Sequence, residues 1–398
     1  MKKNCPTSRF HEFNVNWSSS PASDIFVVET DKDHPELPVL SASQELGMIK
    51  RDNIGINMQY SKQNIASYKR VQPGRFVIHL RSFQGGFAHS AIEGITSPAY
   101  TVLSLKEPHN HDDYFWKYLF TSPEFIKRLE LVTYGIRDGR SISVEDFFGL
   151  PFCYPSTPEE QHKIAQFFSR LNTLIAAEEK KLARLKNMKA ASLEKMFPKL
   201  AETIPLVRFK GFTGDWTEKY IGECFSERKE RSGKGEMISV TINSGVRKAK
   251  ELDRTVHIGD TSNYKVVREG DIAYNSMRMW QGASGYSPYD GILSPAYTVI
   301  TPRENIDSRF FACLFKTKQM IHIFELNSQG LTSDTWNLKY NQLKGIAVRY
   351  PLDKKEQIYI ANFFSRLDTL ITAQEQKLNK LRSLKKSFLE KMFVNVQN

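Results

Sequence analysis

The chain has 398 residues, of which 40% are hydrophobic and 25% are charged, and its formal net charge is +12. This length and composition fit two or three ordinary domains, and the sequence shows neither a run of roughly 18 apolar residues nor an apolar leader after Met1, so membrane insertion and secretion are not indicated. The four scattered cysteines lack C-x-x-C spacing, which argues against a zinc site and a disulfide framework. We therefore expect a soluble cytoplasmic protein with reduced cysteines and no bound metal.

Residues 1–153 are predicted to form a first globular domain of mixed α and β structure. β-rich runs at 76–80 and 100–105 predict strands, and short helices are expected near 113–131. This pattern predicts a small sheet with inserted loops.

Charge is unevenly distributed along the chain. Residues 1–154 contain 17 basic and 17 acidic side chains, yet residues 50–81 carry seven basic side chains against one acidic. Residues 228–250 likewise carry seven basic side chains against two acidic ones. A local basic stretch in each half suits a polyanionic partner, although a solvated surface loop explains either stretch alone equally well.

A long helix is predicted in the segment 154–199, and it is repeated in 350–398. Residues 154–197 match 350–393 at 25 of 44 positions, and the copies start 196 residues apart. Sequence similarity of this extent indicates a protein of two similar halves, each a domain followed by a long helix.

The helix starts are marked by their own signals. Thr157 with Glu160, and Asp353 with Glu356, have the spacing of a capping box. About 40 helical residues span roughly 60 Å, so each apolar stripe needs a long partner. The stripes include Leu174, Met188, Leu370 and Leu384, and the positions expected to pack between the helices are Phe167, Leu171, Ile175, Leu182, Leu185, Phe363, Leu367, Ile371, Leu378 and Leu381.

The connection between the two helices predicts an antiparallel pair. In a parallel pair, the domain between the helices would have to bridge roughly 60 Å, several times its expected radius of gyration of about 15 Å. An antiparallel pair places one domain at each end of a rod, with a pseudo-two-fold axis through it. The alternative is that the repeat forms a coiled coil between two chains.

The second domain, residues 200–349, shares a faint framework with the first. Strands are predicted at 271–274 and 297–301, with short helices near 308–326. The pattern F-x-x-F-x-x-x-W occurs near the start of both domains, and S-P-A-Y-T-V occurs once in each. The framework is therefore repeated, whereas the loops are not.

No catalytic motif withstands inspection. The S-P-A-Y sequence only superficially resembles the [DN]-P-P-[YF] signature of amino-methyltransferases, because Ser and Ala replace two of its residues, and we expect it to be a turn before a buried strand. His109–Asp113 carries metal-capable groups, but a solvated loop is favoured over a metal site. We expect no catalytic residue and no metal ligand in this chain.

With catalytic and metal sites set aside, the remaining candidates are residues suited to binding DNA. Asn, Arg and Gln side chains, which can read base edges, lie beside aromatic residues in glycine-containing loops, in equivalent places in the two halves. The candidates for DNA binding are Lys50, Arg51, Arg81, Ser82, Gln84, Arg137, Arg140, Arg247, Lys248, Lys250, Asn275, Arg278, Trp280, Gln281, Ser333, Thr335 and Asn337. Loops without a partner also contain such side chains.

The helical repeats resemble a known family. Both contain E-Q-x-x-I-A-x-F-F-S-R-L-[ND]-T-L-I, starting at Glu160 and Glu356, and the second domain opens with FKGFTGDW at Phe209–Trp216. On these motifs the chain resembles, over essentially its whole length, the specificity subunit of type I restriction-modification systems. Arg9–Trp17 is a divergent version of the opening motif.

The resemblance implies an α+β fold of two target recognition domains held apart by an antiparallel coiled coil. Each domain would read one half of a bipartite site in double-stranded DNA. The helices would dock two methyltransferase subunits, which methylate adenine with S-adenosylmethionine, and restriction subunits that use ATP and Mg²⁺ would join that core. This chain itself would bind no cofactor and catalyse no reaction.

Two other functions fit the residues. One is a helical scaffold with protein-binding globular ends, and the other is an autonomous DNA-modifying enzyme. Steep salt dependence would distinguish DNA recognition from scaffolding, because DNA binding releases counterions. Methyl transfer by the isolated chain would favour the enzyme.

Overall fold

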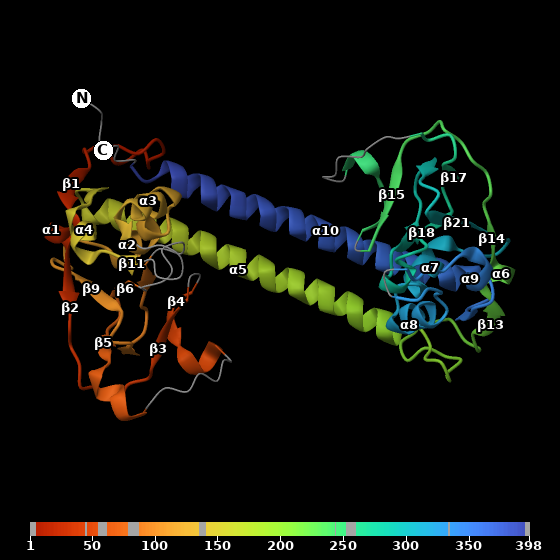
Figure 1. Cartoon of the computed structure of the whole chain (residues 1–398), viewed down its shortest axis with the longest axis horizontal. Coiled ribbons are helices and arrows are strands. Elements are labelled where there is room, and N and C mark those ends of the chain that lie inside the picture. The colour runs from red at the N-terminus through yellow and green to blue at the C-terminus, as the bar shows by residue number, and fades with distance from the viewer. Residues whose placement is uncertain are drawn as a thin grey trace. The chain divides into compact units, whose positions relative to one another are not determined.

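The computed structural model describes residues 5–43, 46–54, 62–78, 87–134, 141–242, 244–251, 260–332 and 335–394 (Figure 1). The chain forms two compact units, Met1–Glu179 with Gln376–Asn398 and Lys180–Glu375. Each unit contains one globular domain and part of two long helices, α5 (Pro158–Lys195) and α10 (Lys354–Lys391). None of the helices within the described ranges is long and apolar enough to cross a membrane.

The first unit is built on a four-stranded antiparallel sheet in the order β2-β9-β6-β7. Its strands are β2 (Phe26–Glu29), β6 (Phe76–Ile78), β7 (Ala88–His89) and β9 (Thr101–Leu105). The aromatic core of the domain includes Phe26, Phe76 and Trp116, which are all fully buried. Around the sheet lie the strand pairs β1 (Ser18–Pro21) with β12 (Pro151–Tyr154), β3 (Leu40–Ser43) with β4 (Gly47–Lys50), β5 (Lys69–Val71) with β8 (Gly94–Thr96) and β10 (Thr133–Tyr134) with β11 (Ser141–Ile142), the α-helices α1 (Ala22–Ile25), α2 (Asp113–Phe120), α3 (Pro123–Leu129) and α4 (Val144–Gly149), and the 3-10 helices η1 (Arg51–Ile54), η2 (Lys62–Ser67) and η4 (Glu130–Val132).

The second unit repeats this topology, with a four-stranded sheet in the order β14-β21-β18-β19. Its strands are β14 (Phe225–Glu227), β18 (Ile272–Asn275), β19 (Ser284–Tyr286) and β21 (Tyr297–Pro302). The pairs are β13 (Thr217–Tyr220) with β22 (Ala347–Tyr350), β15 (Ile238–Thr241) with β16 (Gly245–Lys248) and β17 (Lys265–Val267) with β20 (Gly291–Leu293), and the helices are α6 (Ile221–Cys224), η5 (Ala249–Glu251), η6 (Met279–Gln281), α7 (Ser308–Leu314), α8 (Lys318–Leu326) and α9 (Tyr340–Leu343). The predicted α+β class and internal repeat are confirmed.

Each S-P-A-Y sequence forms the turn expected of it. The amide of Tyr100 donates to the carbonyl oxygen of Ser97 at 3.0 Å, and Tyr297 donates to Ser294 at 3.1 Å. The buried strands β9 and β21 follow directly.

Each predicted region of short helix contains two helices. In both units, a hydroxyl side chain starts the second of them as its N-cap. Ser122 Oγ accepts from the amide of Phe125 at 3.3 Å, and Thr317 Oγ1 accepts from that of Met320 at 3.3 Å.

In the first unit, the start of α5 packs antiparallel against the end of α10. The ring centroids of Phe167 and Phe388 are 4.9 Å apart. Farther along α5, Glu178 forms an ion pair with Lys377. Residue numbers therefore rise along one helix as they fall along the other.

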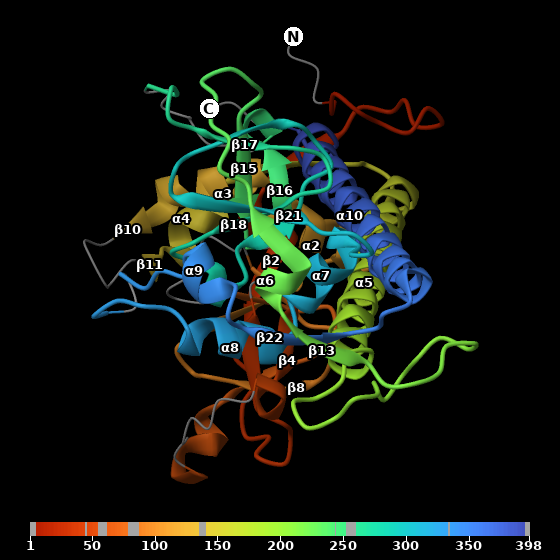
Figure 2. The ribbon, with the colours of Figure 1, turned by 90° about the vertical axis from the view of Figure 1, so that its right-hand side faces the viewer.

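The same direction of packing holds in the second unit. Lys186 Nζ lies 2.7 Å from Glu375 Oε1, and the rings of Phe197 and Phe364 stack with centroids 6.0 Å apart. The two views of Figures 1 and 2 agree in placing α5 and α10 side by side. The pairing thus occurs within one chain, as the chain connection predicts.

The apolar stripe of each helix is wider than the surface that the pair covers. The side chains of Leu174, Met188, Leu370 and Leu384 are 42%, 45%, 53% and 46% exposed. By contrast, the ten positions expected to pack between the helices are all buried or half-buried: Phe167, Leu171, Ile175, Leu182, Leu185, Phe363, Leu367, Ile371, Leu378 and Leu381. Two-helix packing buries a narrow seam, so the outer stripe positions remain accessible.

The glutamates of the predicted capping boxes serve a different purpose. Glu160 accepts from Arg9 Nε at 2.7 Å and from Nη2 at 2.6 Å, and Glu356 accepts from Arg208 Nε at 2.7 Å and from Nη2 at 2.8 Å. These hydrogen bonds raise the pKa of both arginines. The helices begin as predicted, but both carboxylates anchor the segment that opens each domain.

The glutamine after each glutamate completes the anchor. The buried Gln161 side chain donates to the carbonyl oxygens of Pro155 and Asn110 at 3.0 and 3.2 Å. Gln357 repeats these bonds to Pro351 and Asn305 at 2.8 and 3.3 Å. The E-Q pair thus explains part of the repeated motif by its contacts with the domain.

Candidate nucleic-acid interface

Two candidate loops of the second domain come together in the structure. The loop after β18 contains η6, and the second loop runs from Gln329 to Leu338. The amide of Leu338 donates to the carbonyl oxygen of Ser276 at 2.8 Å. The rings of Trp280 and Trp336 meet edge to face with centroids 5.2 Å apart. The described candidates of these two loops therefore belong to one surface.

Local hydrogen bonds order the side chains of the η6 loop. Asn275 Oδ1 accepts from the amide of Met277 at 3.0 Å, and Trp280 Nε1 donates to the Met277 carbonyl oxygen at 3.1 Å. Arg278 is exposed, and its Nη1 donates to Gln281 Oε1 at 3.2 Å. This arrangement presents a guanidinium and an amide together, and both groups can bind base edges in a major groove.

The second loop is ordered by a tight turn. Thr335 Oγ1 accepts from the amide of Thr332 at 3.1 Å and donates to its carbonyl oxygen at 2.9 Å. The backbone of Asn337 pairs with that of Gln329. Ser333, which is also a candidate, lies outside the described residues.

The β15–β16 hairpin and η5, which directly follows it, carry three of the basic candidates. Lys248 and Lys250 both pair with Glu236, at 2.7 and 2.6 Å. Arg247 is half-buried on the same strand, and within the described ranges no carboxylate forms an ion pair with it. Glu236 thus neutralises part of the positive charge expected of this stretch.

Other basic residues of the two stretches hold the fold. Arg228 forms two hydrogen bonds with the buried Asp271, at 2.6 and 2.9 Å. Arg70 pairs with Glu93 at 2.5 Å, and Arg75 pairs with Glu29 at 2.9 Å. Their acidic partners lie far away in the sequence. A count of charge within each stretch therefore overstates the positive charge that is available to bind a polyanion.

Of the DNA-binding candidates in the first domain, only Lys50 and Arg51 lie within the described residues. Lys50 is exposed at the end of β4, and Arg51 Nε donates to Ser41 Oγ at 3.3 Å. The candidates that lie outside the described residues are Arg81, Ser82, Gln84, Arg137 and Arg140.

The sequence His109–Asp113 is only in part the solvated loop that was predicted: His109 and Asn110 are exposed, whereas the last three residues are half-buried. Asp112 caps α2 by accepting from the amide of Phe115 at 3.0 Å, and Asp113 Oδ2 lies 2.6 Å from Nε2 of the buried His89. Burial lowers the pKa of His111. These side chains hold the start of α2, and the described part of the chain contains no group of three or more His, Cys, Asp or Glu suited to a metal ion.

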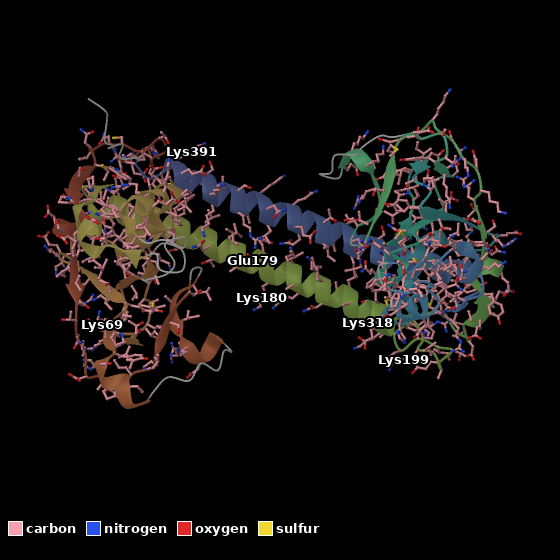
Figure 3. All side chains as sticks on the ribbon, viewed as in Figure 1. Lys69, Glu179, Lys180, Lys199, Lys318 and Lys391 are labelled. Carbon is pink, nitrogen blue, oxygen red and sulfur yellow. The ribbon has the colours of Figure 1, made fainter. Side chains whose placement is uncertain are left out.

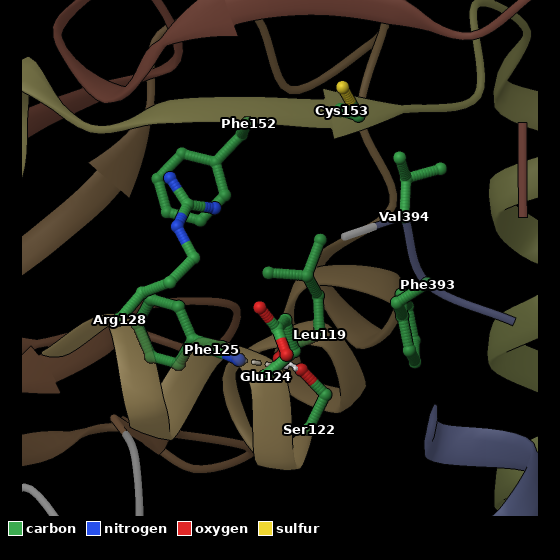
Figure 4. Close-up of a pocket in the computed structure, with 9 residues that line it drawn as sticks. All are labelled: Leu119, Ser122, Glu124, Phe125, Arg128, Phe152, Cys153, Phe393 and Val394. Carbon is green, nitrogen blue, oxygen red and sulfur yellow. Dashed lines mark hydrogen bonds between the residues drawn. The ribbon is translucent and has the colours of Figure 1, made fainter. Parts of the chain in front are cut away.

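A small pocket in the first unit lies beside α3 and β12 (Figure 4). The Arg128 guanidinium lies 5.2 Å from the centroid of the Phe152 ring, and its Nη2 donates to the Pro151 carbonyl oxygen at 2.5 Å. Burial lowers the pKa of Arg128 and raises that of the Cys153 thiol. The space is about 10 Å³, room for one water molecule, so we assign the pocket to packing.

The sequence analysis did not single out Arg9, Arg208 or Lys316. The two arginines follow a repeated signal, since each precedes the first Phe of the F-x-x-F-x-x-x-W pattern. Lys316 has no such signal, because Thr121 occupies its place in the first domain.

The family comparison covers both halves of the chain. A family model described as the type I restriction modification DNA specificity domain matches residues 14–187 and again 214–383. A search of curated proteins finds no match.

Solved structures with the same fold span nearly the whole chain. The S subunit of a type I restriction-modification system from M. genitalium has a TM-score of 0.61 and 16% identity, covering 99% of this chain and 100% of that one. A second structure, described under the words "structural basis underlying complex assembly and conformational transition of the type I R-M system", has a TM-score of 0.55 and 13% identity. The match covers 96% of this chain and 98% of that one. With the fold and both family matches in agreement, the chain belongs to the family of type I restriction-modification DNA specificity subunits.

Proposed function

We propose that each globular domain reads one half of a bipartite DNA target for a type I restriction-modification complex. The observation that carries this proposal is the duplicated framework, β2-β9-β6-β7 and β14-β21-β18-β19, which supports loops of different sequence. One framework with two sets of loops suits two half-sites of different sequence. The recognition is direct readout by side chains, with phosphate contacts that fix the register.

In the second domain, the reading side chains are those of the joined loops. Arg278 and Gln281 are accessible and already hydrogen-bonded to each other, so little conformational entropy is lost on binding. Trp280 and Trp336 form an aromatic platform beside them. Arg247 of the neighbouring hairpin and Lys250 of η5, which follows that hairpin, supply positive charge for phosphates.

The helices supply the docking surface for methyltransferase subunits. Leu174 and Leu384 are exposed in the first unit, and Met188 and Leu370 in the second. Leu174 corresponds to Leu370 in the repeat, and Met188 to Leu384. Two equivalent apolar surfaces suit two copies of one subunit.

The chemistry belongs to the partner subunits in this proposal. The methyltransferase subunits transfer a methyl group from S-adenosylmethionine to adenine. Restriction subunits, where they join, use ATP and Mg²⁺. The specificity chain contributes target choice and assembly.

A domain exchange tests the proposal. Residues 200–349 are replaced by those of a related chain, and the complex is assembled with the methyltransferase subunits. Methylation profiling of host DNA should then show one altered half-site, with the other half-site and the spacer unchanged. A change in both half-sites, or in neither, would contradict one domain per half-site, and a wild-type complex without sequence preference would contradict DNA recognition itself.

A further inference from the structure

Two segments of the second domain's candidate interface are joined by one lysine. Lys316 lies between α7 and α8, and its Nζ donates to the carbonyl oxygen of Ile242 at 2.9 Å and to that of Gly282. Ile242 is in the turn of the β15–β16 hairpin, and Gly282 closes the η6 loop. One ammonium group therefore bridges a basic hairpin and a loop with base-reading side chains.

Among the described residues, no carboxylate forms an ion pair with Lys316. Lys189 of α5 and Asp368 of α10 face it, and these two are already paired with each other at 2.5 Å. Cys313 of α7 is also close. Burial lowers the pKa of Lys316 to about 8, so the folded protein holds a cation whose charge is disfavoured there. The two carbonyl oxygens are its compensation.

The bridge adds to a close backbone contact between the same segments. A Cβ atom on Gly285 would lie 3.0 Å from Gly245 Cα and from the amide nitrogen of Val246. The hairpin thus crosses β19 at glycines, where the backbones touch. Gly282 has a φ of +83°, which favours glycine at the turn that presents its carbonyl oxygen to Lys316.

The first domain keeps the crossing but has no corresponding lysine. A Cβ atom on Gly47 would lie 2.3 Å from the His89 carbonyl oxygen, so the β3–β4 hairpin crosses β7 in the same way. Thr121 precedes the N-cap of α3, as Lys316 precedes that of α8. The Thr121 hydroxyl donates to the Tyr118 carbonyl oxygen of its own helix at 3.0 Å.

We propose that Lys316 is a positioning residue for base reading, and that it fixes the β15–β16 hairpin against the η6 loop so that both engage the second half-site. The inference rests on the proposed function and deepens it, because it separates how the two domains order their loops. Without the bridge the framework and the crossing at Gly245 and Gly285 stay intact, but the hairpin turn and the η6 loop lose the contact that fixes one against the other. Discrimination between correct and altered bases should fall at the second half-site alone.

The test uses the full complex with its methyltransferase subunits and compares Lys316→Met with Lys316→Arg. The Met variant keeps most of the length of the unbranched side chain and removes its donors, whereas the Arg variant keeps donors. Methylation rates are measured on the native target and on duplexes with one base pair changed in either half-site. Lys316→Met should reduce discrimination at the second half-site about tenfold or more, since small misplacements of reading groups are costly. Lys316→Arg should retain most of the wild-type discrimination at the second half-site.

The first half-site and a nearby lysine are the controls. Discrimination at the first half-site should be unchanged in every variant. Lys318 lies two residues after Lys316, and its side chain is exposed (Figure 3). Lys318→Met removes its positive charge and should leave discrimination at both half-sites unchanged. Hydrogen exchange should be faster at the hairpin amides of residues 244–248 in Lys316→Met, while those of β18 keep their protection.

Several outcomes would overturn the inference. Native discrimination in a folded Lys316→Met complex removes the positioning role, and an equal loss at both half-sites indicates general destabilisation. If the Met variant does not fold, Lys316→Gln, with a donor on a shorter side chain, must show the same selective loss. A wild-type complex that fails to discriminate would instead contradict the proposed function, so the two failures are distinguishable.

Discussion

The first and second domains are anchored to the long helices in the same way, but the contacts around their loops differ. The arginine–glutamate pair that holds each domain to its helix has the same 2.7 Å distance between Nε and Oε1 in both units. Before the second short helix, however, Thr121 bonds within its own helix, whereas Lys316 joins two loops. The anchoring contact thus recurs, whereas the lysine that joins two loops in the second domain has no counterpart at Thr121. This is the division that two reading domains of different specificity require.

The largest expected effect comes from shortening both helices together. Deleting residues 178–184 and 374–380 removes seven residues from equivalent positions of α5 and α10, about 10 Å of helix. Both anchors remain, so both half-sites should be retained while the spacer between them becomes shorter. Methylation profiling of cells that carry the deleted chain and its partner subunits measures the gap. A methylated target with the original spacer would show that the helices do not set it.

Breaking the anchors should destabilise one unit at a time. Glu160→Ala leaves Arg9 without its buried partner, and Glu356→Ala does the same to Arg208, each at a cost of about 3–5 kcal/mol. The loss should be larger for Glu160, because it also accepts from Trp17 Nε1 at 3.1 Å.

Hydrogen exchange resolved by unit would measure both losses. Glu159→Ala is the matched control, since that neighbouring glutamate is exposed. Equal loosening of both units by either variant would argue against independent anchors.

A smaller effect is expected from the base-reading arginine of the second domain. Arg278→Ala should cost about 1–3 kcal/mol in binding of the correct target and relax specificity at one position of one half-site. Lys250→Ala should weaken binding nearly uniformly across sequences, because a phosphate contact carries no base information. Competition binding with duplexes changed in each half-site separates these effects. If Arg278→Ala relaxed specificity at the first half-site instead, the proposal that the second domain reads the second half-site would be contradicted.

The smallest effect concerns a repeated ion pair between the helices. Arg382 pairs with Glu179 at 2.6 Å in the first unit, and Lys186 pairs with Glu375 at 2.7 Å in the second. These pairs are exposed, so Arg382→Ala and Lys186→Ala should each cost less than about 1 kcal/mol, and less at high salt. Thermal unfolding at low and high salt is the measurement. A loss above 2 kcal/mol would show that the seam depends on charge more than on packing.

The helices were predictable because their signals are local. Start positions, the three- and four-residue period and the repeat all lie within one segment, and α5 and α10 begin where the sequence indicates. The exposure of Leu174 and Met188 was not predictable, since a pattern of apolar residues does not say how wide a face the partner covers. The role of Glu160 was misread for a related reason, because its partner Arg9 is 151 residues away.

The interface shows the same limit. Composition identified Asn275, Arg278 and Trp280 as side chains suited to DNA, and the structure joins their loop to the one that carries Trp336. Composition could not identify Arg228 as a structural residue, because its carboxylate partner Asp271 is 43 residues away, directly before β18. Lys316 escaped notice because its acceptors are backbone oxygens, which have no signature in a sequence.

The ends of the two long helices have a further consequence. The Lys195 carbonyl oxygen at the end of α5 accepts from the amide of Val207, in the segment that leads into the second domain, at 2.9 Å. The Lys391 carbonyl oxygen at the end of α10 accepts from the amide of Ser8, at the opening of the first domain, at the same distance. One junction continues along the polypeptide, whereas the other is noncovalent and includes, besides these hydrogen bonds, the contact of Phe393 with Phe115. The end of each long helix is therefore held by the segment that opens a domain, although only α5 continues into the domain that it contacts.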